Sequence, residues 1–281
     1  MTSQDDAARA DRAAETALRR YEAFLIDMDG VLTRGKDALP GAAAGLTALR
    51  AYGRPLVLTN NSTRARDELA VHLRSAGFDL SPDEVLGSAF LAAGYLALHF
   101  GPSAVWVLGE EGIRREMELA GHRLAARPED AAWVVVGMDR QLTYQKLALA
   151  LRALIAGARV LATNEDATFP TPTGLVPGAG ALVGALRGMG FAPAALVGKP
   201  SSAAFEVALS VLGLPACRVL MIGDRLETDI AGAERAGVDS ALVLTGVGSP
   251  DDVDRFGVRP TWVAASFAEL CRGRITRFGE G

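Results

Sequence analysis

Two aspartates, Asp27 and Asp29, follow directly after the apolar residues 24–26. Three large apolar residues in a row are typical of a strand that is buried on both faces, as in a parallel sheet. Ligands bind at the carboxyl ends of such strands, and alternate strand residues share a face, so both carboxylates would face the same ligand. Gly30 lets the chain turn sharply behind them. The alternative interpretation is an ordinary surface turn, in which Asp and Gly are common.

Three further predicted strands also end in residues that can bind or react. Hydroxyl and amide side chains follow the second strand, a lysine follows the third, and two more acids follow the fourth. These groups are residues 59–63 after strand 55–58, Lys199 after strand 195–197, and Asp224 and Asp229 after strand 218–222.

The residues after the second strand lead into a predicted helix at 64–76. The first N–H groups of a helix have no partner inside it, so this segment is a candidate anion site. The simplest interpretation makes Ser62 or Thr63 only an N-cap of that helix, and we expect both the cap and the anion site. Lys199 taken alone would be a solvated surface charge, since buried lysines are rare.

Strands and helices alternate along most of the chain, which predicts βαβ units and parallel sheets. The segment from 88 to 185 has its own set: strands 105–108, 133–136 and 160–162, and helices 88–100, 110–120 and 143–155. Ser81 and Glu84 have capping-box spacing, with Pro82 at the first helical position, where we expect a helix to begin. We predict a helical or disordered extension at 1–20, a first domain at 21–87 and 186–281, and an inserted domain at 88–185. The strand at 195–197 is expected in the first domain.

Composition excludes several classes of protein. The chain has 281 residues, 49% hydrophobic and 22% charged, and a formal net charge of -4. This balance indicates a globular protein and gives no basic run for nucleic acid. Residues 1–20 lack the apolar core of a secretory signal, and segment 90–100 is too short to span a membrane. Cys217 and Cys271 have no metal or redox spacing and are expected to be reduced, which fits a cytoplasmic protein.

Taken together, the four strand ends resemble the motifs of the haloacid dehalogenase superfamily. The Thr-Asn-Asn and Gly-Lys-Pro sequences and the large insert between the second and third motifs resemble its class IIA, the NagD-like phosphatases. The similarity covers residues 24–248. The matching motifs are Asp27-Met28-Asp29-Gly30, Thr59-Asn60-Asn61, Gly198-Lys199-Pro200, and Gly223-Asp224 with Thr228-Asp229.

The resemblance implies a fold and a reaction. The fold would be α/β, with a Rossmann-like parallel-sheet core and an inserted, smaller α/β cap domain. The reaction would be Mg²⁺-dependent hydrolysis of a small phosphorylated metabolite, such as a sugar phosphate, glycerol phosphate, phosphoglycolate or nucleotide monophosphate, through an aspartyl phosphate. No nucleic-acid or membrane partner is implied, and the family suggests a homodimer through the cap.

The resemblance also implies roles for individual residues. Asp27 would be the nucleophile, and Asp29 would protonate the leaving group and then activate water. Phosphate would be bound by Thr59, Asn60 and Lys199. The magnesium ligands would be Asp27, Asp29 through its carbonyl, and Asp224, supported by Asp229 in an outer shell.

The polar loop at 163–180 would present Asn164, Glu165, Asp166 and Phe169 to the substrate's leaving group. Phe169 could instead be packed in the core. Two residues depart from the family pattern, Thr33 where an aromatic residue is common and Glu165 where a proline is common. Both lie where substrate identity could be set.

Two other functions use the same motifs. A phosphotransferase or phosphomutase would form the same aspartyl phosphate but pass it to an acceptor. A non-catalytic phosphate-binding protein would keep the scaffold without turnover. The second alternative is disfavoured because all four motifs retain their reactive residues.

Overall fold

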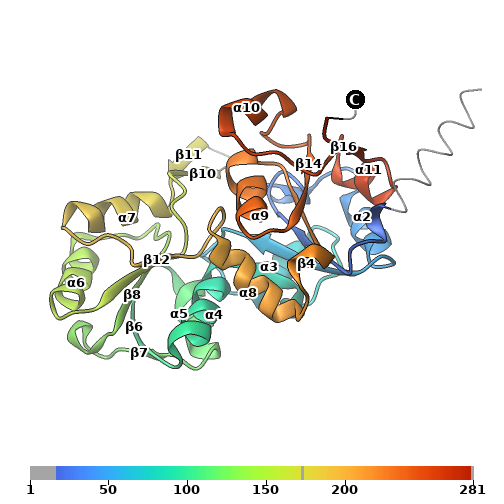
Figure 1. The fold of residues 1–281 in the computed structure, drawn as a ribbon. Coiled ribbons are helices and arrows are strands. Elements are labelled where there is room, and N and C mark those ends of the chain that lie inside the picture. Colours follow the sequence, from blue (N-terminus) through green and yellow to red (C-terminus); the bar gives the residue numbers. More distant parts are fainter. Residues whose placement is uncertain (1–16, 172–173, 280–281) are drawn as a thin grey trace, which may run out of the picture. The chain divides into compact units, whose positions relative to one another are not determined.

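A computed structural model describes residues 17–171 and 174–279 (Figure 1). The chain forms two compact units. The first comprises Met1–Leu58, Ala70–Glu84 and Ala208–Gly281, and the second comprises Thr59–Leu69 and Val85–Val207. These limits differ from the predicted borders near 88 and 185, and the division into core and cap stays a prediction.

A seven-stranded sheet with β1 near its centre organises the first unit. The strand order is β16-β15-β14-β13-β1-β4-β5, and β1 pairs in parallel with β13 on one side and β4 on the other. All four residues of β1 are buried, as the apolar run predicts. The strands are β1 (Ala23–Ile26), β4 (Arg54–Thr59), β5 (Val85–Gly87), β13 (Val219–Gly223), β14 (Asp239–Val243), β15 (Trp262–Ala264) and β16 (Thr276–Arg277). By the limits above, the edge strand β5 belongs to the second unit.

Short elements complete the first unit. A small antiparallel pair follows β1, and a five-residue π-helical turn, Leu226–Ile230, follows β13. The remaining elements are β2 (Thr33–Arg34), β3 (Asp37–Ala38), α2 (Ala42–Leu49), α9 (Ala231–Arg235), α10 (Val253–Phe256) and α11 (Phe267–Cys271). Helices α3 (Arg66–Ser75) and α8 (Ser202–Leu212) each begin in the second unit and end in the first.

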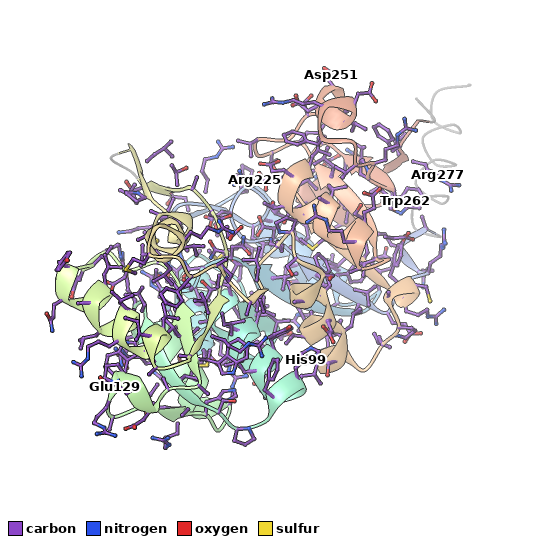
Figure 2. The ribbon with its side chains drawn as sticks, turned by 60° about the vertical axis from the view of Figure 1, so that its left-hand side comes forward. His99, Glu129, Arg225, Asp251, Trp262 and Arg277 are labelled. Carbon is purple, nitrogen blue, oxygen red and sulfur yellow. The ribbon has the colours of Figure 1, made fainter. Side chains whose placement is uncertain are left out.

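Tyr21 holds the entry to β1 in place. Its hydroxyl donates to Asp239 Oδ2 at 2.7 Å and accepts from Trp262 Nε1 at 2.9 Å (Trp262 is labelled in Figure 2). Asp239 begins β14 and Trp262 begins β15, so three strands are tied together at their amino ends. Burial raises the pKa of the Tyr21 hydroxyl, which therefore stays protonated. The catalytic motifs are predicted at the opposite, carboxyl end of the sheet.

The second unit contains a five-stranded sheet in the order β12-β9-β8-β6-β7. Each neighbouring pair of strands in this order is parallel. The order reverses between β6 and β8, because β7 follows β6 on one side while β8 lies on the other. The elements are α4 (Ser88–Phe100), β6 (Ala104–Leu108), α5 (Glu111–Leu119), β7 (Arg123–Leu124), β8 (Trp133–Val136), α6 (Tyr144–Ile155), β9 (Arg159–Ala162), α7 (Ala179–Gly188) and β12 (Ala195–Leu196).

The strand at 195–197 was predicted for the first domain, and this assignment is wrong. The strand appears as β12, which pairs with β9 of the second unit. Backbone bonds from Ala194 N to Val160 O and from Val197 N to Ala162 O extend the pairing beyond the strand. The alternation of strands and helices along the sequence indicates that a strand exists, but it does not indicate which of the two parallel sheets the strand joins.

Two local predictions need correction, one for the start of a helix and one for a loop. Glu84 Oε2 accepts from both the backbone N (2.9 Å) and the hydroxyl (3.2 Å) of Ser81, but the helix is only a 3₁₀ turn over Pro82–Glu84, and β5 follows. The loop at 163–180 includes an antiparallel hairpin of β10 (Thr168–Thr171) and β11 (Gly174–Pro177).

None of the described helices combines the length and the apolar character needed to cross a membrane.

Candidate active site

Three acids predicted from two motifs come together in the first unit. Asp27 follows β1 and Asp224 follows β13, and these neighbouring parallel strands end at the same edge of the sheet. Asp229 joins them from the π-helical turn. Each of the three offers a carboxylate oxygen within 4.8 Å of the others, and all three side chains are buried. Asp27 is only 8% exposed, so the surface-turn interpretation is wrong.

Backbone packs tightly around the Asp224 carboxylate. A Cβ added at Gly246 would lie 1.6 Å from Asp224 Oδ2, and one added at Gly30 would lie 2.4 Å from the same oxygen. Val247 N donates to Oδ2 at 3.0 Å, and Gly248 N donates to the Asp224 carbonyl at 2.8 Å. Both Gly246 and Gly30 are therefore needed for close approach, and the loop after β14 fixes the orientation of this carboxylate.

Asp29 occupies a different environment from Asp27. It is half-buried and lies in a tight turn, where Gly30 (φ +86°) donates to the Thr33 carbonyl at 2.7 Å. Thr245 Oγ1 donates to the Gly30 carbonyl at 2.6 Å, and Arg34 Nη2 donates to the Thr245 carbonyl at 2.7 Å. The turn after β1 is thus held by the loop after β14.

The acidic cluster fits a hard divalent cation. Mg²⁺ holds oxygen ligands at about 2.1 Å and Ca²⁺ at about 2.5 Å, so ligands of one ion lie within about 4 to 5 Å of each other. The separation of the three carboxylate oxygens, within 4.8 Å, meets this requirement. Three buried carboxylates so close together would repel one another strongly without a cation.

The second unit collects the residues of the middle motifs around Asn60. Its Nδ2 donates to the Lys199 carbonyl at 3.0 Å and to Asp166 Oδ2 at 3.2 Å. The carbonyl of Asn60 accepts from Asn164 Nδ2 at 2.8 Å and from Ser88 Oγ at 2.7 Å. Asn60 therefore joins the loop after β9 to the loop after β12.

Lys199 and Thr59 are both buried, at 4% exposed each. The solvated-charge interpretation of Lys199 is therefore wrong. Gly198 N donates to the Thr163 carbonyl at 2.7 Å, which fixes the start of the lysine loop. Thr59 Oγ1 accepts from Asn61 N at 3.3 Å.

Ser62 and Thr63 do not act as the predicted helix cap. Ser62 Oγ accepts from Met138 N at 3.2 Å, and Thr63 Oγ1 donates to Asn61 Oδ1 at 3.0 Å. Glu116 caps the first turn of α3 instead, because its Oε1 accepts a hydrogen bond from Arg66 N at 2.7 Å. The sequence could not reveal a cap that comes from 50 residues further along the chain.

The four residues predicted to meet the leaving group divide into two sets. Asn164, Asp166 and Phe169 line one small cavity of about 20 Å³ in the second unit. Glu165 instead pairs with Arg187 of α7, with Oε1 and Nη2 2.5 Å apart. Phe169 is half-buried beside this cavity, so it is not packed away in the core.

Sequence reasoning missed several residues that line the same cavity. Met138 follows β8, as Asn164 follows β9, and the carboxyl ends of these adjacent parallel strands were the available signal. Gly178 and Ala179 also line the cavity and were not assigned to a site, whereas Ser62 and Thr63 belong to the predicted anion site at 59–63.

Comparison with known proteins identifies the family. Residues 24–123 match a family model described as haloacid dehalogenase-like hydrolase, and residues 196–270 match one described as HAD-hydrolase-like. An acid sugar phosphatase of Staphylococcus aureus is 36% identical over 255 residues, covering 90% of this chain and 96% of the relative.

Solved structures give the same result. A p-nitrophenyl phosphatase from Archaeoglobus fulgidus superposes with a TM-score of 0.84 at 34% identity, covering 89% of this chain and 98% of that one. A glycerol phosphate phosphatase from Mycobacterium tuberculosis, solved in complex with magnesium and also with calcium, has a TM-score of 0.83 at 38% identity. It covers 90% of this chain, and 77% of its own length is matched in the magnesium complex. The predicted enzyme class, a phosphoric monoester hydrolase, is confirmed, and the chain belongs to the haloacid dehalogenase-like hydrolases, among the NagD-like class IIA phosphatases that its motifs predicted.

Proposed function

We propose that this protein is a magnesium-dependent phosphatase that hydrolyses small phosphorylated metabolites through an aspartyl phosphate. The observation that carries the proposal is the buried cluster of Asp27, Asp224 and Asp229. The relatives named above act on sugar phosphates, glycerol phosphate or p-nitrophenyl phosphate, and a substrate of that size and charge is the one we propose here.

Asp27 is the proposed nucleophile. Hydrolysis of phosphate monoesters is among the slowest uncatalysed reactions, so dividing it through a covalent intermediate is useful. A carboxylate oxygen of Asp27 attacks phosphorus, and the bond to the leaving alcohol breaks. Water then attacks the phosphorus of the aspartyl phosphate and restores the carboxylate.

Asp29 is the proposed proton carrier. It gives a proton to the departing alkoxide and takes one from the attacking water, and so must be neutral at the first step. The half-buried position of Asp29, beside the buried Asp27, supports a division of roles between the two acids. A symmetric metal clamp would give both carboxylates the same surroundings.

The cation would be held by the side chains of Asp27 and Asp224 and by the Asp29 carbonyl, with Asp229 supporting them. When bound, it neutralises negative charge on the acids and on the phosphoryl oxygens. Lys199 and the Thr59 hydroxyl are the proposed ligands of the phosphoryl group, together with backbone N–H groups near Asn60. The place of Lys199 in the third family motif and the bond between its carbonyl and Asn60 Nδ2 support this role.

Substrate choice is proposed to depend on the loop and hairpin after β9. Asn164 and Asp166 are fixed by their bonds with Asn60 and offer polar groups, while Phe169 offers an apolar surface. Glu165 acts indirectly in this proposal, by anchoring the loop to Arg187. The homodimer through the cap that the resemblance suggests stays a prediction.

The proposal is tested by phosphate release from p-nitrophenyl phosphate and a panel of phosphometabolites. We expect turnover that needs Mg²⁺, disappears with a chelator and returns when Mg²⁺ is restored in excess, with the physiological class giving the highest kcat/KM. Full activity in the presence of the chelator would contradict the metal requirement. Transfer of the phosphoryl group to an added alcohol in preference to water would indicate a phosphotransferase.

A further inference from the structure

A second cavity in the second unit lies outside the residues that the phosphatase reaction uses. It has a volume of about 390 Å³, within the usual range for small-molecule sites. Residues that follow β6 and β8 line it, together with residues from the first turns of α5 and α6. The lining residues are Gly109, Glu110, Glu111, Arg114, Asp139, Arg140, Gln141 and Lys146.

The position of this cavity in the fold is itself informative. In the order β12-β9-β8-β6-β7, the chain direction across the sheet reverses between β6 and β8. The connections leaving these two strands diverge, so a crevice opens at their carboxyl ends, and ligands of open α/β sheets bind in such crevices. This cavity is lined from the ends of β6 and β8.

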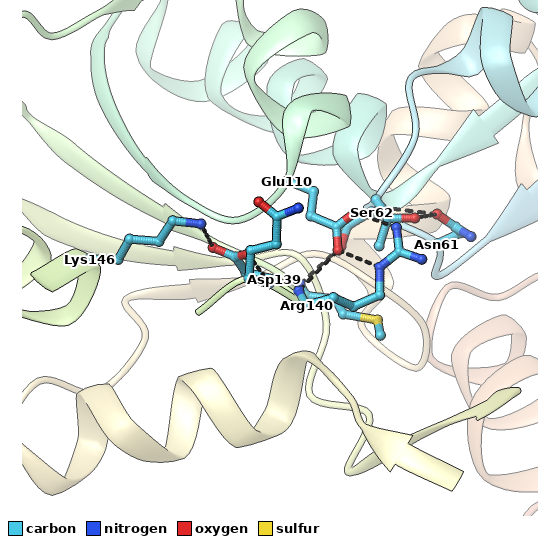
Figure 3. Close-up of polar contacts among 9 residues, drawn as sticks. Asn61, Ser62, Glu110, Asp139, Arg140 and Lys146 are labelled. Atoms are coloured by element: carbon cyan, nitrogen blue, oxygen red, sulfur yellow. Dashed lines mark hydrogen bonds and ion pairs between the residues drawn. The ribbon is translucent and has the colours of Figure 1, made fainter. Parts of the chain in front are cut away.

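Two ion pairs line the cavity (Figure 3). Arg140 binds both carboxylate oxygens of Glu110, through Nε at 2.7 Å and Nη2 at 2.6 Å, and its backbone N donates to Oε1 at 3.0 Å. Lys146 Nζ lies 2.6 Å from Asp139 Oδ2, while Gln141 N donates to Oδ1 at 2.8 Å. The Arg140 guanidinium holds the pKa of Glu110 below its usual value despite the burial that opposes it, so this pair stays ionised.

Two opposite charges remain after these pairs are formed. Among residues 17–171 and 174–279, neither Glu111 nor Arg114 makes an ion pair or a side-chain hydrogen bond, although they lie three residues apart on α5. Arg114 is half-buried, with five N–H donors suited to a phosphate, and the N-terminal end of α5 adds favourable dipoles. Lys146 has three N–H donors, of which the contact with Asp139 needs one.

The remaining acceptors select for hydroxyl groups. The Glu111 carboxylate and the Gln141 side-chain oxygen accept hydrogen bonds, so both are suited to sugar hydroxyls. A bare inorganic anion would be repelled by the Glu111 carboxylate, because it brings no hydroxyl group that could bind this carboxylate. A neutral sugar would desolvate Arg114 without giving it an anionic partner.

We propose that this cavity binds a small organic phosphate that carries free hydroxyl groups, the class that includes nucleoside monophosphates and sugar phosphates. Its phosphate would lie against Arg114 and Lys146, and its hydroxyls against Glu111 and Gln141. The site is separate from the residues assigned to hydrolysis, so the proposal does not depend on the phosphatase activity.

The test measures binding of AMP and of glucose 6-phosphate by titration calorimetry. The whole chain is used with Asp27→Asn as background, so that bound ligand is not consumed. Into this background Arg114→Gln is introduced, and Arg115→Gln serves as the matched control. Arg115 is the next residue on α5 and pairs with Asp67, away from the cavity lining.

We expect Arg114→Gln to lose one binding event per chain for at least one of the two ligands, or to weaken it by at least about tenfold, because a charge-assisted bond to phosphate is removed. Arg115→Gln should bind as the background does. Equal binding by the two variants would overturn the proposal, whatever the active site binds. Glu111→Gln should weaken binding of the organic phosphates but not of inorganic phosphate, which the Glu111 charge repels, and equal effects would contradict the role given to hydroxyl groups.

Discussion

The Asp224 carboxylate has little room to move. One carboxylate oxygen accepts a backbone N–H from Val247, and the space beside it is filled by the backbone of Gly246 and Gly30. A carboxylate held this way loses little conformational entropy when it binds a cation. The site therefore depends on Gly246 and Gly30 as well as on Asp224.

Gly246→Ala tests this dependence. The new Cβ would lie 1.6 Å from Asp224 Oδ2, so either the carboxylate or the loop must move. We expect phosphate release to fall by roughly 100-fold or more, about 2.7 kcal/mol of barrier, with weaker Mg²⁺ binding by calorimetry.

Gly184→Ala is the matched control. Gly184 lies inside α7, and nothing lies within 4 Å of an added Cβ. This change should keep activity and stabilise the protein by about 0.5 to 1 kcal/mol, because alanine favours a helix. Wild-type Mg²⁺ affinity and turnover in Gly246→Ala would refute the close-approach argument.

Glu116 should make stability depend on pH. It is buried under the first turn of α3, and burial raises its pKa above the ordinary 4.5 despite the bond from Arg66 N. The unfolded chain then releases this proton at lower pH than the folded one. The stability of the wild type relative to the Glu116→Gln protein should therefore fall as pH rises from 4.5 to the raised folded value.

The measurement compares Tm across that pH window for wild type, Glu116→Gln and Glu118→Gln. We expect the Glu116→Gln protein to gain in Tm relative to wild type as pH rises. Glu118 is exposed on the same helix, and its substitution should leave the difference flat. A constant difference for Glu116→Gln would show that the buried carboxyl is not responsible.

At the scale of elements, strands with continuous apolar runs could be predicted closely. The expected strand 133–136 and helix 88–100 match β8 and α4 to the residue, and Thr143 caps α6 by accepting from Lys146 N at 3.2 Å. Burial of a strand on both faces and capping of a helix both depend on residues that are close together in the sequence. The closeness of the acids after β1 and β13 could also be predicted, because the carboxyl ends of adjacent parallel strands lie at the same edge of a sheet.

Features that depend on distant partners could not be predicted. The choice of sheet for β12, the role of Glu116 at α3 and the pairing of Glu165 with Arg187 each depend on residues far away in the chain. The hairpin of β10 and β11 was hidden because prolines and glycines are typical of loops as well. Local patterns hold no information about any of these contacts.

The β10 and β11 hairpin offers a test of substrate selection. Phe169 on β10 lines the cavity beside Asn164 and Asp166, whereas Leu175 on β11 is 71% exposed. We expect Phe169→Ala to change the ratio of kcat/KM between a small and a bulky phosphate monoester by about tenfold, equal to about 1.4 kcal/mol. Leu175→Ala should leave the ratio unchanged, and equal effects of the two substitutions would contradict selection by Phe169.

At the scale of the whole molecule, the motif residues are divided between the two units. The first unit contains Asp27, Asp29, Asp224 and Asp229, and the second contains Thr59, Asn60 and Lys199. The proposed reaction needs both sets, because the acids carry negative charge that the phosphoryl ligands and the cation must offset. The relatives named above match about nine-tenths of the chain, which includes residues of both units.

The most direct test of the proposed mechanism is Asp27→Asn, measured by Mg²⁺-dependent phosphate release from p-nitrophenyl phosphate. The substitution keeps the shape of the side chain and removes the nucleophile. We predict at least about a 10³-fold loss of turnover, roughly 4 kcal/mol of barrier, with a Tm no lower than that of the wild type and with full activity in the exposed control Asp37→Asn. Near wild-type phosphate release by Asp27→Asn would contradict the aspartyl-phosphate mechanism.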